Sequence, residues 1–537
     1  MKNFMKTAKL LTMLLLGVNF HAFSQTTQSA VVKVEGGLVE GNIENGITIY
    51  RGIPFAAPPV GDLRWRPSQP VKIWEGILKA DTFAPACLQQ PGVFTTGFTK
   101  YGFSEDCLYL NIWKPNETSD KKLPVMVWIF GGGFASGSAS GDFTTGEKLA
   151  EKGVIVVNIS YRLGVFGFLA HPALTDESEN HVSGNYGLLD QIAGLKWVQK
   201  NIESFGGDPY NVTIFGQSAG GISVSILSAS PLAKGHFQRA ICMSGGSFYP
   251  ASVKRDPEYS VQLLKGAEIL GVEFTNRMGV NSIEELRKIE PGKFLSDPMS
   301  SIGGVFPIID EYVITDDQYK LYKEGKYNDV PVMIGSTSDE GSLLTMMAKP
   351  SEYVEATRKR FGNLSAKVLS LYPDGTDDIT RRSMADLSRD LTFGWPTYAW
   401  ATLQTKTGLS SVYVYYFDQI QPISMLTTFL KSNKAFHGSD CFYAFGSLKQ
   451  YEPIIKTKYT DEDQRLSETI INYWTNFAKH GDPNGKELPV WPVYQQGKPT
   501  VMYLKSDPKP GPYPNLEKIK VIDEYYSRKR DMAEKSR

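Results

Sequence analysis

The chain has 537 residues, of which 41% are hydrophobic and 12% aromatic, enough to bury a large core. Lys plus Arg and Asp plus Glu each number 57, so the formal net charge is zero. Nucleic-acid-binding proteins usually carry a basic excess, and its absence argues against nucleic acid as a partner. No linker, repeat or low-complexity tract divides the chain, so we expect residues 25–537 to form a single domain.

The first residues have the composition of a signal peptide. Three lysines within the first nine residues precede a short apolar run at 10–20, and Ala22-Phe23-Ser24 offers small residues for cleavage before Gln25. This pattern predicts a signal peptide at 1–24 and export to the periplasm or the extracellular space. No later apolar stretch is long enough for a membrane span, so none is expected.

The chain contains four cysteines. Cys87 and Cys107 are close in sequence, and in an oxidising compartment we expect them to pair. Cys242 lies in an apolar run and is interpreted as a buried, inert thiol, whereas the surroundings of Cys441 give no clear prediction. No Cys-x-x-Cys motif or His-rich cluster is present, so the sequence predicts no metal and no cofactor.

Strands and helices alternate between about 123 and 245. Continuous apolar runs at 123–130 and 154–159 predict buried strands, and apolar residues at helical spacing predict a helix at 188–202 that Gly206, Gly207 and Pro209 end. Further strands are expected near 212–215, through Ile241, and at 330–335 and 412–417. This alternation predicts an α/β fold with a large, mostly parallel sheet and helices on both faces. The segments 251–325 and 345–405 are expected to be helical insertions that shape a pocket over the sheet's carboxyl edge.

The segment 211–221 carries the most informative motif. A β-branched run enters Gly216-Gln217-Ser218-Ala219-Gly220, and the small residues that follow can open a helix. A strand, a tight turn and a helix around Gly-x-Ser-x-Gly are typical of a nucleophilic serine on a strained elbow. Gly216 and Gly220 are expected because side chains there would collide with the strand and the helix.

A serine hydroxyl needs a base within hydrogen-bonding reach, and that base needs an acid to orient it. Among the six histidines, His21 is in the signal segment, and His171 and His181 precede the serine. His236 follows Ser218 too closely for an acid-bearing strand to intervene, and His480 reads as the end of a helix. The serine–acid–histidine order therefore favours His437, which lies in a loop after a strand.

The acid is expected at the end of a strand between Ser218 and His437. The strand at 330–335 is followed by the loop 336–341, which contains Asp339 and Glu340. Chemistry alone does not choose between these two carboxylates.

An oxyanion intermediate needs hydrogen-bond donors. Gly131-Gly132-Gly133-Phe134 directly follows the buried strand at 123–130, and glycines allow backbone amides to approach a reacting carbonyl. Together with the amide of Ala219, just past the serine, the triplet predicts an oxyanion hole with three donors.

With these pieces in place, the chain resembles the type-B carboxylesterases, the carboxylesterase/cholinesterase branch of the α/β-hydrolase fold, from about 31 to about 503. The resemblance rests on a set of motifs that is highly specific when taken together. The motifs are Arg51-Gly52-Ile53-Pro54, Glu105-Asp106-Cys107-Leu108-Tyr109-Leu110-Asn111, Gly131-Gly132-Gly133-Phe134, Phe205-Gly206-Gly207-Asp208-Pro209, Phe215-Gly216-Gln217-Ser218-Ala219-Gly220-Gly221 and Asp339-Glu340-Gly341.

The resemblance implies a role for each matching residue. It makes Ser218 the nucleophile, Glu340 the acid and His437 the base. It also implies that the amides of Gly132, Gly133 and Ala219 are the oxyanion donors. It implies a disulfide between Cys87 and Cys107, and a buried ion pair between Arg51 and Glu105.

Two departures from the family pattern concern the substrate. Many relatives carry Glu before the nucleophile, where this chain has Gln217, and the change removes a negative charge from the pocket. Cholinesterases place a tryptophan inside the early disulfide loop to hold a quaternary ammonium. Here the aromatic residues between the two cysteines are Phe94, Phe98, Tyr101 and Phe103. Both departures argue against a cationic choline ester and favour a neutral ester.

The sequence therefore predicts a secreted serine carboxylic-ester hydrolase that acts on a small-molecule ester through an acyl-enzyme. Within enzymes, a specialised hydrolase of plant-polysaccharide acyl groups or xenobiotic esters is the alternative, and an amidase is also compatible with the same residues. A non-catalytic binding protein on the same scaffold is a further alternative, because fold does not dictate function. The sequence makes no prediction about oligomeric state.

Overall fold

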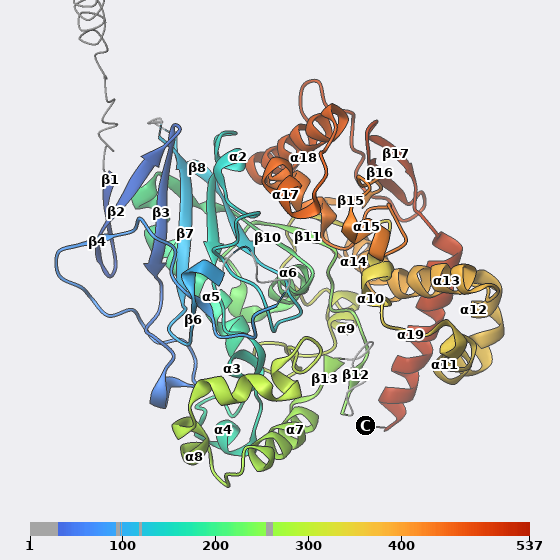
Figure 1. The fold of residues 1–537 in the computed structure, drawn as a ribbon, viewed down its shortest axis with the longest axis horizontal. Coiled ribbons are helices and arrows are strands. Elements are labelled where there is room, and N and C mark those ends of the chain that lie inside the picture. Colours follow the sequence, from blue (N-terminus) through green and yellow to red (C-terminus); the bar gives the residue numbers. More distant parts are fainter. Residues whose placement is uncertain (1–29, 93–96, 98, 117–120, 254–260, 537) are drawn as a thin grey trace, which may run out of the picture.

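One large sheet organises the molecule (Figure 1). The computed structural model describes residues 30–536 except 93–96, 98, 117–120 and 254–260. The predicted signal peptide at 1–24, and Phe94 and Phe98, lie outside the described residues. Within the described part, thirteen strands join in the order β1-β2-β3-β7-β9-β8-β10-β11-β14-β15-β16-β17, with β4 beside β2.

The middle of the sheet, from β9 to β16, is parallel. Its central strands are buried on both faces, as expected when helices cover both sides of a parallel sheet. The parallel strands are β9 (Ile155–Ile159), β8 (Leu123–Ile129), β10 (Gly207–Gln217), β11 (Arg239–Met243), β14 (Val332–Thr337), β15 (Val412–Phe417) and β16 (Thr500–Leu504).

Antiparallel strands extend the sheet at both ends. These are β1 (Ala30–Val34), β2 (Gly37–Glu44), β3 (Ile47–Pro54) and β7 (Tyr109–Pro115) at one end and β17 (Lys509–Pro512) at the other, while β4 (Ile77–Lys79) pairs in parallel with β2. Two short pairs lie outside the sheet, β5 (Ala86–Cys87) with β6 (Phe103–Ser104) and β12 (Ala251–Ser252) with β13 (Val261–Gln262).

Helices that follow the parallel strands pack on the sheet. Those that contact its strands are α2 (Glu147–Ala150), α5 (Tyr186–Asn201), α6 (Ala219–Ala229), α14 (Trp395–Thr407) and α18 (Asp461–His480). The same connections also contain α3 (Gly164–Phe168), α4 (Pro172–Glu177), α16 (Ser439–Ala444) and α17 (Leu448–Ile455). No helix in the part of the chain that the structure describes is both long and apolar enough to cross a membrane.

Most of the predicted elements are confirmed, and the boundary after α5 is the main correction. The helix stops at Asn201, and a short 3-10 turn (Ile202–Phe205) leads to Gly206, which has a φ of 84°. Pro209 does not end the helix but lies in β10, where the register with β8 shifts between Gly207 and Val212. Proline has no backbone N–H to donate to a strand ladder, so it is tolerated at an irregularity where the regular pairing is interrupted.

The second predicted helical insertion is largely helical, whereas the first is helical only in part and also contains β12 and β13. The first contains α7 (Leu264–Arg277), α8 (Ile283–Lys288) and α9 (Gln318–Lys323), although 301–317 is irregular. The second contains α11 (Tyr353–Phe361), α12 (Ser365–Leu371) and α13 (Asp377–Arg389), and Figure 1 shows these helices grouped beside the C-terminal helix α19 (Leu516–Ser536). Helix α10 (Glu340–Leu344) and α15 (Met425–Phe429) complete the α-helices of the described residues.

Candidate active site

Ser218 lies in a sharp turn between β10 and α6. Its backbone adopts φ 57° and ψ −124°, a conformation that L-residues with side chains rarely adopt. A Cβ atom on Gly220 would lie 1.9 Å from the carbonyl oxygen of Ile129, and one on Gly216 would lie 2.5 Å from the backbone of Gly220. The predicted collisions are therefore confirmed, and the two glycines allow the strained turn that holds the Ser218 hydroxyl beyond the sheet edge.

His437 is the histidine that the structure brings to Ser218. Its Nε2 atom lies 2.9 Å from Ser218 Oγ. His171 instead caps the N-terminus of α4 through its side chain, and His480 is the last residue of α18. The elimination made from the sequence thus selected the histidine that lies within hydrogen-bonding distance of the serine.

The structure chooses between Asp339 and Glu340. Glu340 Oε2 lies 2.5 Å from His437 Nδ1, and the Glu340 side chain is fully buried. Asp339 instead accepts hydrogen bonds from the backbone amide and hydroxyl of Ser342, so it caps α10. The backbone amide of Asp339 also donates to the carbonyl of Ala435 at 2.8 Å, which joins the acid loop to the histidine loop.

The three residues predicted to supply oxyanion donors lie around the cavity that contains Ser218. Gly132 and Gly133 follow β8, and Ala219 is the first residue of α6. All three line the same cavity as Ser218 and His437. Gly132 and Gly133 have φ values of 115° and 63°, so glycine is needed at both positions. Amide groups in the first turn of a helix are not used by the helix itself, which makes the Ala219 amide available to an oxyanion.

The cavity beside Ser218 has a volume of about 950 Å³ and is mainly apolar. Most of its lining residues come from the two insertions, as predicted, and α6 and residues 246–249 supply others. Charged side chains occur within one short stretch, at Lys349, Glu352 and Arg360. The apolar side chains that line it include Ile222, Val261, Ile302, Phe306, Leu344, Met346, Met347, Phe361, Met384, Leu387, Leu391 and Phe393. No cluster of His, Cys, Asp and Glu among the described residues is arranged to hold a metal ion.

Three contacts of the site were not predicted from the sequence. Ser244, at the end of β11, donates from Oγ to Glu340 Oε1 at 2.6 Å. Asp440 is buried near Glu340 and accepts a hydrogen bond of 2.8 Å from the Tyr415 hydroxyl. Burial, and to a smaller extent the carboxylate of Glu340, raises the pKa of Asp440 to about 7. Phe393 stacks on the His437 ring, with centroids 4.7 Å apart. Of these three residues, only Ser244 has a local sequence feature that could have predicted its place in the site, because it directly follows a parallel strand.

The predicted disulfide is confirmed, and the predicted ion pair is wrong. Cys87 and Cys107 are bonded to each other. Glu105 pairs not with Arg51 but with Arg64, through two hydrogen bonds of 2.6 and 2.7 Å between nearly buried side chains. Arg51 pairs with Glu44 on the neighbouring strand β2. Arg64 follows a 3-10 turn (Gly61–Leu63) and lies beside Glu105. The local sequence around Arg51 and Arg64 does not indicate which of them pairs with Glu105.

Comparisons with known proteins identify the family of this chain. A model of the "Carboxylesterase family" matches residues 28–521. The chain is 37% identical to a para-nitrobenzyl esterase of Bacillus subtilis (strain 168), over 89% of this chain and 95% of the relative. It is 36% identical to a fumonisin B1 esterase of Sphingopyxis macrogoltabida, over 88% and 86%, and 36% identical to a liver carboxylesterase of Sus scrofa, over 84% of each.

Solved structures give the same result. A PNB esterase structure superposes with a TM-score of 0.79 at 34% identity, covering 92% of this chain and 99% of that chain. The resemblance noted from the motifs and the predicted α/β-hydrolase fold are thereby confirmed. The chain belongs to the carboxylesterase family and is a carboxylic ester hydrolase.

Proposed function

We propose that this chain is an exported serine esterase that hydrolyses neutral esters through an acyl-enzyme, with Ser218, His437 and Glu340 as its catalytic residues. The observation that carries the proposal is the continuous contact from Ser218 Oγ to His437 and on to buried Glu340, at the base of an apolar cavity. Export rests on the composition of residues 1–24.

The proposed reaction follows from the order of the contacts, in which His437 lies between Ser218 and Glu340. His437 Nε2 accepts the Ser218 proton as Oγ attacks the ester carbonyl, and Glu340 stabilises the imidazolium through Nδ1–H. The amides of Gly132, Gly133 and Ala219 stabilise the oxyanion. His437 then gives its proton to the leaving alcohol. A water molecule repeats the sequence on the acyl-enzyme and releases the acid with the serine restored.

The preference for neutral esters rests on the groups around the serine. Gln217, which precedes the nucleophile, places its amide nitrogen 3.2 Å from His437 Nε2, where a glutamate would add a negative charge. The cavity wall that contains Ser218 is mainly apolar and includes Ile222, Phe306 and Phe393. A quaternary ammonium would therefore find no carboxylate at the position before the nucleophile, and the loop between Cys87 and Cys107 offers no tryptophan for a cation–π contact.

The size of the cavity favours a second, narrower candidate. About 950 Å³ can hold a bulky ester, such as a xenobiotic ester or an acyl group on a plant polysaccharide. Two relatives are named for particular esters, fumonisin B1 and para-nitrobenzyl esters. A library of esters that varies acyl length and alcohol size separates the two candidates, because a specialised enzyme shows one strong preference and a general esterase shows a broad profile.

The test of the catalytic assignment compares wild type, Ser218→Ala and Ser351→Ala, a matched control at an exposed serine. With short-chain p-nitrophenyl esters, Ser218→Ala is expected to lower kcat by about 10⁶, whereas Ser351→Ala retains activity. A fluorophosphonate should label wild type and Ser351→Ala but not Ser218→Ala. Turnover by Ser218→Ala at the wild-type rate would overturn the assignment, and a mature protein that begins at Met1 would overturn the proposed export.

A further inference from the structure

A π-helical turn lies against the proposed catalytic base. Residues Asp390–Gly394 form a π-helix between α13 and α14, and such turns often occur at functional sites. The turn places the Phe393 ring parallel to the His437 imidazole, with centroids 4.7 Å apart and 12° between the ring planes. Phe393 is 4% exposed, so the stack forms inside the protein and is shielded from water on most sides.

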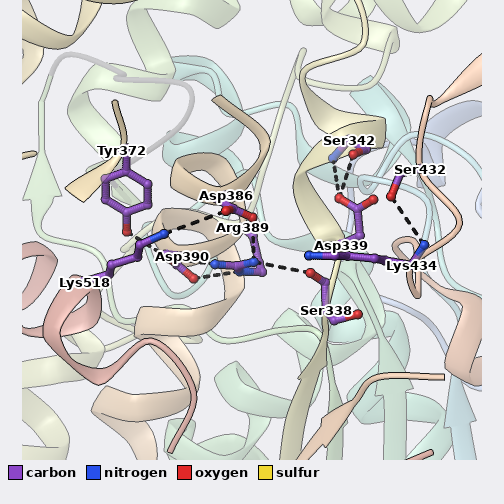
Figure 2. A network of polar contacts seen from close by, with 10 residues as sticks. All are labelled: Ser338, Asp339, Ser342, Tyr372, Asp386, Arg389, Asp390, Ser432, Lys434 and Lys518. Atoms are coloured by element: carbon purple, nitrogen blue, oxygen red, sulfur yellow. Dashed lines mark hydrogen bonds and ion pairs between the residues drawn. The ribbon is translucent and has the colours of Figure 1, made fainter. Parts of the chain in front are cut away.

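A buried arginine ties this turn to the loop that carries Glu340. Arg389, just before the turn, donates two hydrogen bonds to the Asp390 carboxylate, at 2.8 and 3.0 Å, and one to Asp386 at 2.8 Å. It also donates to the backbone carbonyl of Ser338 at 3.3 Å, two residues before Glu340. Figure 2 shows Arg389 lying between the two aspartates and Ser338.

Hydroxyl groups from three other segments hold the turn itself. The Tyr372 hydroxyl donates to Asp390 at 2.8 Å (Figure 2), the Tyr249 hydroxyl to the carbonyl of Thr392 at 2.6 Å, and the Tyr513 hydroxyl to the carbonyl of Gly394 at 3.0 Å. A π-helix leaves backbone groups without their usual α-helical partners, and these bonds satisfy two of its carbonyls. The turn, and with it the Phe393 ring, is therefore fixed rather than adjustable.

We propose that Phe393 is a positioning residue for the base, held by the π-helical turn and Arg389. Its ring fixes the plane of the His437 imidazole between Ser218 and Glu340, and its π face stabilises the imidazolium that forms when His437 takes the serine proton. The proposal rests on the role of His437 in the proposed function. The Arg389 contact with Ser338 keeps the acid loop and the stacked ring in one fixed arrangement.

The other groups around His437 come from outside the π-helical turn. Glu340 contacts Nδ1, Ser218 and Gln217 contact Nε2, and Asp440 lies three residues along the chain and is electrostatically coupled to the ring. A change in turnover on replacing Phe393 therefore reports on the stacked ring. If Phe393 were only part of the cavity wall, its replacement would alter ester binding and hence KM rather than kcat.

The experiment measures kcat, KM and Tm for wild type, Phe393→Leu, Phe393→Met, Phe393→Tyr and Phe306→Leu with p-nitrophenyl acetate. Phe393→Leu and Phe393→Met remove the ring, so kcat is expected to fall about tenfold while KM changes less than about twofold. Phe393→Tyr keeps the ring and is expected to retain kcat within about twofold. Phe306→Leu removes a ring of the same cavity that packs on Phe134, and it is expected to change KM more than kcat.

The proposal would be overturned if Phe393→Leu had the wild-type kcat, or if its only change were in KM. If the Tm of Phe393→Leu is too low for the assay, the same comparison is made with Phe393→Met. An equal loss in Phe393→Tyr would also contradict it. Ser218→Ala, measured alongside, separates this result from the proposed function. If Ser218→Ala is inactive while Phe393→Leu is fully active, the inference alone fails; if Ser218→Ala is active, the proposed function fails.

Discussion

Ser244 Oγ donates a hydrogen bond of 2.6 Å to Glu340 Oε1, on the opposite side of the carboxylate from His437. The backbone amide of Thr337 donates to the same oxygen at 2.7 Å. The two donors stabilise the charge of a carboxylate that has no contact with solvent. The other oxygen, Oε2, stays directed at His437 Nδ1. Ser244 thus links β11 to the acid loop after β14.

Replacing Ser244 should weaken catalysis more than substrate binding. Ser244→Ala removes one donor from a buried charge, a loss of about 1.5–3 kcal/mol, so we expect kcat to fall by about tenfold or more with little change in KM. The control is Ser228→Ala, which removes a buried hydroxyl that bonds the carbonyl of Val224 in α6. Equal kcat in wild type and Ser244→Ala, measured with p-nitrophenyl acetate, would show that Thr337 alone suffices.

Gln217 offers a test of the preference for neutral esters. Its amide lies 3.2 Å from His437 Nε2, so Gln217→Glu would place a negative charge beside the imidazolium with almost no change in shape. An opposite charge at this range favours the protonated ring, so the acidic limb of the kcat/KM–pH profile should move to higher pH by about one unit or more.

The same variant should narrow the difference between substrates. We expect Gln217→Glu to raise the ratio of kcat/KM for acetylthiocholine to that for a neutral thioester of similar size. Gln217→Met, which is uncharged and of similar length, serves as the control. A pH profile and a substrate ratio that match wild type would contradict the electrostatic explanation.

The two arginine–glutamate pairs should differ in their contribution to stability. Arg64→Met leaves Glu105, whose side chain is 8% exposed, as a buried charge without its bidentate partner. We expect the free energy of unfolding to fall by about 3 kcal/mol or more. Arg51→Met leaves Glu44, which is 44% exposed and can be solvated, so a loss of about 1 kcal/mol is expected. Urea denaturation measures both, and an equal loss would be the contrary result.

Asp440 should make stability depend on pH in an unusual direction. Its pKa is raised from 3.8 to about 7 by burial, so between these values the folded chain binds a proton that the unfolded chain has lost. The contribution of this group to the free energy of unfolding therefore falls as pH rises from about 4 to 7, and it is constant above that range.

The variant Asp440→Asn isolates this contribution. The difference in free energy of unfolding, variant minus wild type, should increase from pH 4 to pH 7 and then level off, as measured by urea denaturation at a series of pH values. Tyr415 can still donate to the amide oxygen, so the hydrogen bond of 2.8 Å has a replacement. A difference that is flat or decreases with pH would rule out a protonated Asp440 in the folded state.

The sequence alone determined the parts of the site that depend on local geometry. Eleven residues, 211–221, contain the sequence signals for the strand, the turn and the helix around Ser218. Gly216 and Gly220 are required because side chains there would collide with the backbone of the turn and of the adjacent strand. His437 followed from the order of residues along the chain, because few histidines were available. The buried parallel strands could also be predicted from the sequence, since strands that are covered on both faces are apolar throughout.

The tertiary structure alone decided which distant groups meet. Asp339 and Glu340 are neighbours on one loop, and the bond between the Asp339 amide and the Ala435 carbonyl sets which of the two carboxylates reaches His437. The partner of Glu105, the Ser244 hydroxyl and the Phe393 ring likewise depend on contacts between segments far apart in the chain. Local sequence encodes backbone preference, whereas these contacts depend on the packing of whole elements against one another.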